Sequence, residues 1–521
     1  MIPFDARGAF CPAAEESELR RQAIRGATAT VSASGLGLAV QVLGTVLLAR
    51  LLTPADFGVV TMATTFSLFL ASVGLNGFTE AVIQFEELDR DTASNLFWLN
   101  CLVGLVLSVG FAWVGSLLAR FYRDSVVADV ATGLSVGVFI GATSVIHLAL
   151  LKRAMRFGAT SAVEVLGRVV YTAVSIMFAW RGWGCFALVT GIVAQQLSMS
   201  AGAWWFCRWT PGLPRRTANT RTIVVFATKV YGQFGLRYCT RNVDNLLVGW
   251  RFNAATLGFY KKAYDLFALS ASQLTGPLNN VALAALSRVN QNPGRFTRYL
   301  TTSLGVIAFV GMAMSADLTL VGRHVVRLVL GSRWSESGAI FELFGPGVGS
   351  MLICTSVVAW IHLSIGKPGR LLRWSVVEFA VTISLFLAAL PWGPRGVAAA
   401  WSISYWILLI PGIWYAGRPM GFGVSALIEA IWKFVAAALI AALGTAAILG
   451  GTPFWGTATS TGFAFEAILV ISSVFIAAYL GVVALLHRGL APLQQVVALL
   501  WELAPARWAA KPAGEPVEER N

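Results

Sequence analysis

The chain has 521 residues, of which 57% are hydrophobic and only 12% are charged. Soluble domains carry about 25% charged residues, so this composition excludes a fold whose whole surface faces water. The net charge of +14 comes from Lys and Arg clusters between apolar runs, which is typical of membrane-protein loops and argues against a nucleic-acid interface.

The predicted elements begin with a short polar tail. Residues 1–26 are rich in charged side chains and lack the apolar core of a signal peptide, so we expect them to lie in the cytoplasm. About fourteen apolar segments follow, each near the roughly 20 residues that a membrane-spanning helix needs. They lie at 28–49, 56–78, 94–118, 126–150, 160–180, 184–207, 222–250, 257–286, 299–321, 338–365, 371–391, 396–416, 424–449 and 463–486.

Basic residues in the connecting segments predict the orientation. With a cytoplasmic N-terminus, the inside segments carry about 23 Lys and Arg and the outside segments about 11, with Lys261 and Lys262 counted outside. This bias favours both termini in the cytoplasm of a bacterial cell, with the helices in its inner membrane. The connecting segments are too short for a sizeable extramembrane domain, and residues 488–521 are expected to form a second cytoplasmic tail.

The two halves of the chain resemble each other. IHLALLKR at 146–153 corresponds to IHLSIGKP at 361–368, and Glu164 corresponds to Glu378, at nearly constant offsets of 215 and 214 residues. A repeat of about six helices gives both halves the same orientation. The predicted fold is therefore an all-α polytopic membrane protein with a parallel repeat. Its parts are an N-terminal lobe at 27–221, a C-terminal lobe at 222–418, each of about six helices, and two further helices at 419–487.

Glycine and proline residues mark further features of these helices. Gly58 and Gly258 are in register in the two halves, and each lies where one predicted helix ends and the next begins. Gly276-Pro277 and Gly345-Pro346-Gly347 are expected to interrupt the eighth and tenth segments, either as hinges or as close-packing sites.

The segment at 222–250 carries a polar stripe. The residues that recur at every fourth position are Lys229, Gln233, Arg237, Arg241 and Asn245. They share one helical face over roughly 24 Å, so we expect them to line a hydrated cavity for an anionic substrate, because Arg pairs well with phosphate oxygens. Asp244 is a further polar candidate. The alternatives are a structural Arg241–Asp244 pair and a Lys229 side chain that reaches the membrane surface.

Three more charged residues lie within apolar segments. Glu164 and Glu378 are candidates for proton or cation coupling. A carboxylate within a membrane segment is costly, and such residues commonly mark ion or proton pathways. For Glu164 the alternative is an ion pair with Arg168, one helical turn later. Lys433 is a candidate cavity cation, and its alternative is to reach the membrane surface.

Enzyme and metal motifs are absent from the sequence. The chain contains no GxSxG, HExxH or Walker A motif, and its six Cys and four His residues are dispersed without metal-ligand spacing. We therefore expect neither a catalytic site nor a cofactor or metal.

Several short motifs carry a resemblance to a known family. They are LLARLLTPADFG at 47–58, NLFWLN at 95–100, LLKRAMRF at 150–157, RNVDNLLVG at 241–249, LGFYKKAYDL at 257–266, GPL at 276–278 and ALSR at 285–288. Over roughly residues 30–420 the chain resembles the Wzx-type polysaccharide flippases of the multidrug/oligosaccharidyl-lipid/polysaccharide exporter superfamily.

The resemblance implies two helical bundles and a transport function. Such a protein is expected to move a polyprenyl-diphosphate-linked oligosaccharide across the membrane by alternating access, for exopolysaccharide, capsule or O-antigen (lipopolysaccharide) synthesis. The implied partners are this lipid-linked substrate, membrane lipid, and polysaccharide polymerase and export proteins. One alternative is a multidrug or cation exporter of the same fold, which a cationic cavity disfavours. The other is a membrane polysaccharide polymerase or ligase, for which the loops are too short.

Overall fold

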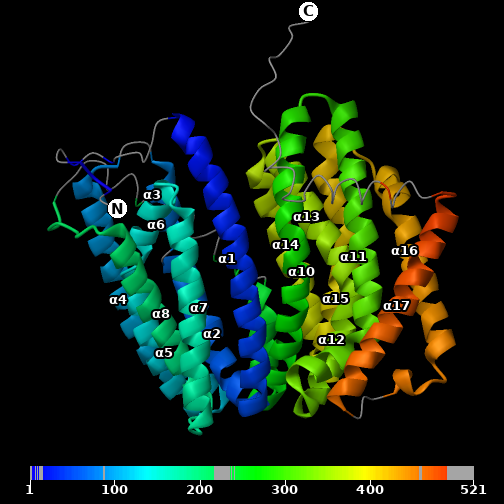
Figure 1. Cartoon of the computed structure of the whole chain (residues 1–521), viewed down its shortest axis with the longest axis horizontal. Coiled ribbons are helices and arrows are strands. Elements are labelled where there is room, and N and C mark those ends of the chain that lie inside the picture. The colour runs from blue at the N-terminus through cyan, green and yellow to red at the C-terminus, as the bar shows by residue number, and fades with distance from the viewer. Residues whose placement is uncertain are drawn as a thin grey trace, which may run out of the picture. The chain divides into compact units, whose positions relative to one another are not determined.

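The computed structural model describes residues 3–5, 8, 10, 16–74, 76–85, 88–215, 224, 235, 238–239, 241–456, 460–489 and 494. This part of the chain is built from helices and contains no β-strand (Figure 1). A segment in hydrocarbon must satisfy its backbone hydrogen bonds internally, and a helix does so. The bilayer therefore accounts both for the apolar composition and for the helical fold. The all-α prediction is confirmed.

Sixteen α-helices have both ends defined within the described residues. In chain order they are α1 (Glu16–Leu51), α2 (Pro54–Gly74), α3 (Asn76–Gln84), α4 (Arg90–Tyr122), α5 (Val126–Ala142), α6 (Val145–Arg153), α7 (Phe157–Trp180), α8 (Cys185–Cys207), α10 (Ala254–Val289), α11 (Pro293–Leu330), α12 (Ser335–Phe344), α13 (Val348–Ser364), α14 (Pro368–Ala389), α15 (Gly393–Gly417), α16 (Val424–Leu449) and α17 (Thr461–Leu486), all within the described residues. Residues 241–251 are also helical. Short 3-10 helices include η1 (Ser332–Trp334) and η2 (Gly345–Gly347).

Within the described residues, 10 helical spans are long and apolar enough to cross a membrane, and a shorter apolar helix covers Pro54–Leu70. The predicted segment at 126–150 is broken, because α5 ends at Ala142 and α6 begins at Val145. The break predicted at 345–347 is confirmed by η2, whereas α10 continues without interruption through Gly276-Pro277. The number of about fourteen helices stays a prediction, since much of 222–250 lies outside the described residues.

The chain divides into two compact units. The first comprises Met1–Leu269, Arg323–Phe344 and Leu372–Ser404, and the second comprises Ser270–Gly322, Gly345–Leu371 and Tyr405–Asn521. The first unit therefore contains segments of both sequence repeats. Trp334 of η1 donates a hydrogen bond from its indole N–H to the carbonyl oxygen of Ala49 at 2.9 Å, and its ring packs against Phe57. Both contacts join the second repeat to the first within this unit.

Equivalent helices in the two repeats begin with equivalent caps. At the start of α2, the Thr53 hydroxyl accepts the backbone N–H of Asp56 at 3.3 Å, and the Asp56 carboxylate accepts the backbone N–H of Thr53 at 2.9 Å. Before α10, the side-chain oxygen of Asn253 accepts the backbone N–H of Thr256 at 2.9 Å. These side chains satisfy N–H groups that have no partner inside the helix, and they fix where both helices start.

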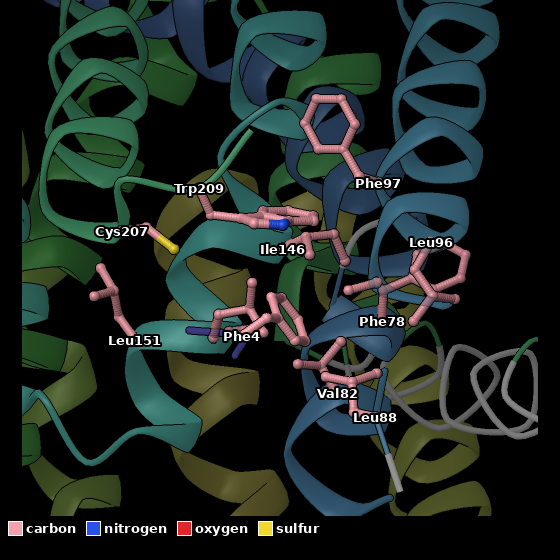
Figure 2. Close-up of a cluster of buried hydrophobic side chains, with 13 residues drawn as sticks. Phe4, Phe78, Val82, Leu88, Leu96, Phe97, Ile146, Leu151, Cys207 and Trp209 are labelled. Carbon is pink, nitrogen blue, oxygen red and sulfur yellow. The ribbon is translucent and has the colours of Figure 1, made fainter. Parts of the chain in front are cut away.

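Part of the N-terminal segment folds onto the first unit. Phe4 is only 6% exposed and joins a buried apolar cluster formed chiefly by α3, α4 and α6 (Figure 2). Its ring lies 5.8 Å from that of Trp209 and 6.0 Å from that of Phe10. The backbone N–H of Arg90 donates to the Gly8 carbonyl at 2.9 Å. The predicted tail at 1–26 thus contains side chains that pack against the helices.

In the second unit, α16 and α17 pack together and against α11. The hydroxyl of Tyr479 donates to the carbonyl oxygen of Phe309 at 2.8 Å, and the Phe309 and Phe434 rings meet edge to face at 5.9 Å. Phe434 also stacks on His487, with ring centroids 4.9 Å apart. These contacts hold the last two helices against the preceding repeat, in a region where the bilayer supplies little driving force for helix association.

Candidate functional site

The residues of the predicted polar stripe are only partly described. Lys229, Gln233 and Arg237 lie outside the described residues. Arg241, which is exposed, and Asn245, which is buried, lie on the helical stretch 241–251. The side-chain amide of Asn245 donates to the side-chain oxygen of Asn242, three residues earlier, at 3.3 Å.

Asp244 has a partner that the sequence did not reveal. Its side chain is 2% exposed, and it accepts a hydrogen bond from the Tyr260 hydroxyl of α10 at 2.8 Å. No ion pair joins Asp244 to Arg241 among the described residues, although they are three positions apart. The bond to Tyr260 links the stretch 241–251 to α10 and satisfies a carboxylate that is costly to bury.

The structure adds two basic residues that the sequence analysis had counted on the outer side of the membrane and had not assigned to the site. Lys261 and Lys262 lie in the second turn of α10. The Lys261 ammonium is 2.8 Å from the Asp265 carboxylate, and these side chains are 26% and 41% exposed. The Lys262 ammonium lies 4.0 Å from the ring centroid of Phe57 on α2, a cation–π contact between the two repeats.

These groups form one cluster. Tyr260, which bonds to Asp244, directly precedes Lys261 on α10, and the Lys261 ammonium also lies 5.4 Å from the ring centroid of Tyr264. We call Arg241, Asp244, Lys261, Lys262 and Asp265 the α10 cluster. Its three basic and two acidic side chains give it a positive excess.

The α10 cluster is positioned by helix geometry. Lys261 and Asp265 are four residues apart, so they share a face of α10 and pair directly. Tyr260 precedes Lys261 and therefore points about 100° away, towards the stretch 241–251. The sequence signal for this arrangement was the KKAYD motif at 261–265, which starts inside a predicted membrane segment.

The remaining predicted residues lie on other helices. Glu164 is exposed on α7, and no ion pair joins it to Arg168 among the described residues. Glu378 is half-buried on α14 in the first unit. Lys433 is half-buried on α16 in the second unit, with its ammonium 6.0 Å from the ring centroid of Trp432. In the described part, no three His, Cys, Asp or Glu side chains are grouped as metal ligands.

Comparison with known proteins identifies the family. Residues 47–339 match the family of polysaccharide biosynthesis proteins. The succinoglycan biosynthesis transport protein ExoT of Rhizobium meliloti (strain 1021) is 19% identical over 64% of this chain and 68% of its own length. The lipopolysaccharide biosynthesis protein WzxC of Escherichia coli (strain K12) is 22% identical over 65% of this chain and 71% of its own.

Solved structures show the same fold. The lipid II flippase MurJ, in an inward closed conformation, aligns with a TM-score of 0.71 at 14% identity, over 89% of this chain and 99% of its own. An inward-facing multidrug resistance MATE family transporter of the MOP superfamily aligns with a TM-score of 0.54 at 13% identity, over 77% of this chain and 95% of its own.

The helical spans and the fold that the chain shares with these solved structures define a multi-pass membrane protein. The chain belongs to the family of polysaccharide biosynthesis proteins, among the Wzx-type polysaccharide transporters. The resemblance inferred from the short motifs is thereby confirmed.

Proposed function

We propose that this protein is a flippase for a polyprenyl-diphosphate-linked oligosaccharide in a bacterial inner membrane. The observation that carries the proposal is the α10 cluster, in which Lys261 and Lys262 place two half-buried ammonium groups near the start of α10. Charged groups are costly to bury even in part, and they are retained where they have a partner or serve a ligand.

A diphosphate matches the charge of the α10 cluster. Lys261 is neutralised by Asp265, but Lys262 rests on an aromatic ring, and no ion pair of Lys262 is found among the described residues. An anionic headgroup supplies the missing countercharge and accepts hydrogen bonds from both ammonium groups. By sequence spacing, the predicted stripe residues Lys229, Gln233 and Arg237 share a helical face with Arg241 and Asn245, and we propose that they add to this positive charge.

Transport requires no covalent change in the substrate. We propose alternating access, in which the two repeats expose the site first to one side of the membrane and then to the other. Both termini lie in the cytoplasm in this scheme, so the lipid-linked sugar is collected where it is made. Glu164 and Glu378 remain candidates for ion coupling, and Lys433 for a further cation on the path. A polysaccharide polymerase and export proteins are the proposed downstream partners.

Cation export is the alternative for this fold, and the charge of the site distinguishes the two. A site with excess ammonium and guanidinium groups repels a cationic drug and attracts a diphosphate. No feature of the described residues favours a polymerase or ligase, for which paired acid and base groups at one membrane face are needed.

The test uses cells that lack the gene. Polyprenyl-diphosphate sugars are extracted and measured by mass spectrometry, and surface polysaccharide is quantified in parallel. We expect an oligosaccharide intermediate to accumulate and the surface polymer to fall, and we expect the wild-type gene to reverse both changes. Unchanged levels of both would exclude this substrate and redirect the test to cation efflux.

A matched pair of variants ties the result to the α10 cluster. Lys261→Ala combined with Lys262→Ala is expected to leave the intermediate accumulated, although the protein is made and inserted. Lys367→Ala removes a lysine charge from the exposed turn before α14 and is expected to restore export fully.

A further inference from the structure

The start of α10 is joined to α2 by a cation and an aromatic ring. The Lys262 ammonium lies 4.0 Å from the ring centroid of Phe57, a side chain that is 6% exposed. One turn before Lys262, the two helices touch backbone to backbone, because a Cβ atom on Gly258 would collide with the carbonyl oxygen of Pro54. The contact between the repeats therefore consists of a close backbone crossing and one charged side chain beside it.

The ring of Phe57 has a second partner in Trp334. The buried Trp334 ring of η1 meets it edge to face at 5.5 Å, and the indole N–H donates to the Ala49 carbonyl oxygen at 2.9 Å. Trp334 also packs edge to face on Phe259 of α10, with ring centroids 5.9 Å apart. These contacts hold together the end of α1, the starts of α2 and α10 and the segment before α12, all within the first unit. We call Phe57, Lys262 and Trp334 the latch.

The Lys262 ammonium belongs both to the latch and to the α10 cluster. A phenyl ring attracts a cation only through its quadrupole, whereas a diphosphate carries full negative charges and accepts hydrogen bonds. An anionic ligand at the α10 cluster therefore competes with Phe57 for the ammonium and binds it more strongly. The flexible four-carbon stem of lysine lets the ammonium leave the ring without a movement of the α10 backbone. Ligand binding then removes one of the contacts that hold α2 to α10.

We propose that Lys262 makes the latch sensitive to ligand: an anionic lipid headgroup at the α10 cluster draws the ammonium off the Phe57 ring and loosens the crossing of α2 and α10. This inference rests on the proposed flippase function and gives its site control over a gate. In the proposed orientation, Ala49, Phe57 and Trp334 lie near the outer ends of their helices, so a loosened latch opens towards the outer leaflet. The ligand shifts this equilibrium because it binds better to the state in which Lys262 has left the ring.

The test follows one cysteine beside the latch, in the purified full chain in nanodiscs with its six natural cysteines replaced by alanine. Ala49→Cys, the reporter, is a small change at a side chain that is 1% exposed. Undecaprenyl diphosphate is expected to raise the rate at which a water-soluble maleimide labels the reporter by about two- to tenfold, which corresponds to the loss of one cation–π contact. Uncharged undecaprenol is expected to leave the rate unchanged. Ala131→Cys, buried between α4 and α5, is the control and is expected not to respond to either lipid.

Two substitutions in the reporter protein test the latch without any lipid. Lys262→Met keeps most of the apolar stem and removes the charge, and Phe57→Leu removes the ring. Each is expected to raise the labelling rate about two- to tenfold in the absence of lipid. Phe252→Leu removes the ring that lies 5.6 Å from the Arg251 guanidinium, a contact within one repeat, and is expected to label like the reporter protein itself. Thermal melting of each purified variant checks folding.

Binding of undecaprenyl diphosphate, measured separately by native mass spectrometry, distinguishes the outcomes. A lysine that only binds the ligand gives slow labelling in Lys262→Met both with and without lipid, and this result overturns the latch. If the reporter protein binds the diphosphate and its labelling rate does not change, the latch also fails, although the flippase function survives. If it does not bind the diphosphate, the proposed function fails and the latch fails with it. Fast labelling of a stably folded Lys262→Met without lipid, matched by the lipid-bound reporter, supports the proposal.

Discussion

Gly58 of α2 and Gly258 of α10 occupy equivalent positions of the two sequence repeats, and each packs against the backbone of the other helix. A Cβ atom on Gly58 would collide with the carbonyl oxygen of Ala254, and one on Gly258 would collide with that of Pro54. The contact is reciprocal, since both glycines and both carbonyl-bearing residues are 200 positions apart. Only a residue without a side chain permits this approach of two helices.

The first prediction concerns this crossing. Gly58→Ala and Gly258→Ala are each expected to destabilise the protein by about 1–3 kcal/mol, because a backbone carbonyl cannot move aside as a flexible side chain does. Thermal unfolding in detergent measures the effect. Gly444→Ala on α16 meets no atom within 4 Å and is expected to be neutral or slightly stabilising. Melting of Gly58→Ala at the wild-type temperature would show that the helices cross less closely.

The second prediction concerns the buried carboxylate. Tyr260→Phe removes the hydroxyl that donates to Asp244 at 2.8 Å and leaves a buried acceptor unsatisfied. The expected loss of stability is about 1–3 kcal/mol. Tyr299→Phe removes a hydroxyl from a side chain that is 50% exposed and is expected to have no effect. Equal melting temperatures for the two variants would mean that the backbone N–H of Asn245, which donates to the other carboxylate oxygen at 2.8 Å, suffices for Asp244.

The third prediction concerns the ion pair of the α10 cluster. Asp265→Asn releases Lys261 from its carboxylate partner, so its ammonium becomes available to an anionic ligand. Because this pair is partly exposed, we expect a modest gain in affinity for undecaprenyl diphosphate, roughly two- to fivefold. Lys261→Gln is expected to lower the affinity. Glu336→Gln breaks the exposed pair with Arg395 and should leave binding unchanged. A fall in affinity for Asp265→Asn would mean that Asp265 itself contributes to binding.

The fourth prediction concerns Arg237, which the sequence alone places on the polar stripe. Arg237→Ala is expected to reduce surface polysaccharide in complemented deletion cells, because the path for a diphosphate loses a cation. Arg251→Ala, which alters an exposed arginine at the end of the stretch 241–251, is the control. If Arg237→Ala supports normal export while ethidium efflux by the wild type is measurable, the cation-exporter alternative gains the stronger support.

Much of the fold was predictable because membrane insertion depends on local composition. Apolar runs of bilayer length predicted α4, α7, α8, α16 and α17 within a few residues of their bounds. The interruption at 345–347 also followed from its glycines and proline. The same reasoning was wrong at Gly276-Pro277, where α10 continues, because a membrane helix tolerates proline when neighbouring groups compensate for the lost hydrogen bond.

The sequence by itself indicated that a bilayer surrounds most of this protein, that its fold is helical and that its two halves resemble each other. Hydropathy, backbone hydrogen bonding and sequence similarity can all be read from short segments. Only the tertiary structure decided which charged groups meet. Tyr260, not Arg241, bonds to Asp244, and Lys262 lies on a ring of the other repeat. Such partners are set by how distant helices pack, and spacing along one helix carries no information about the side chains that another helix brings to it.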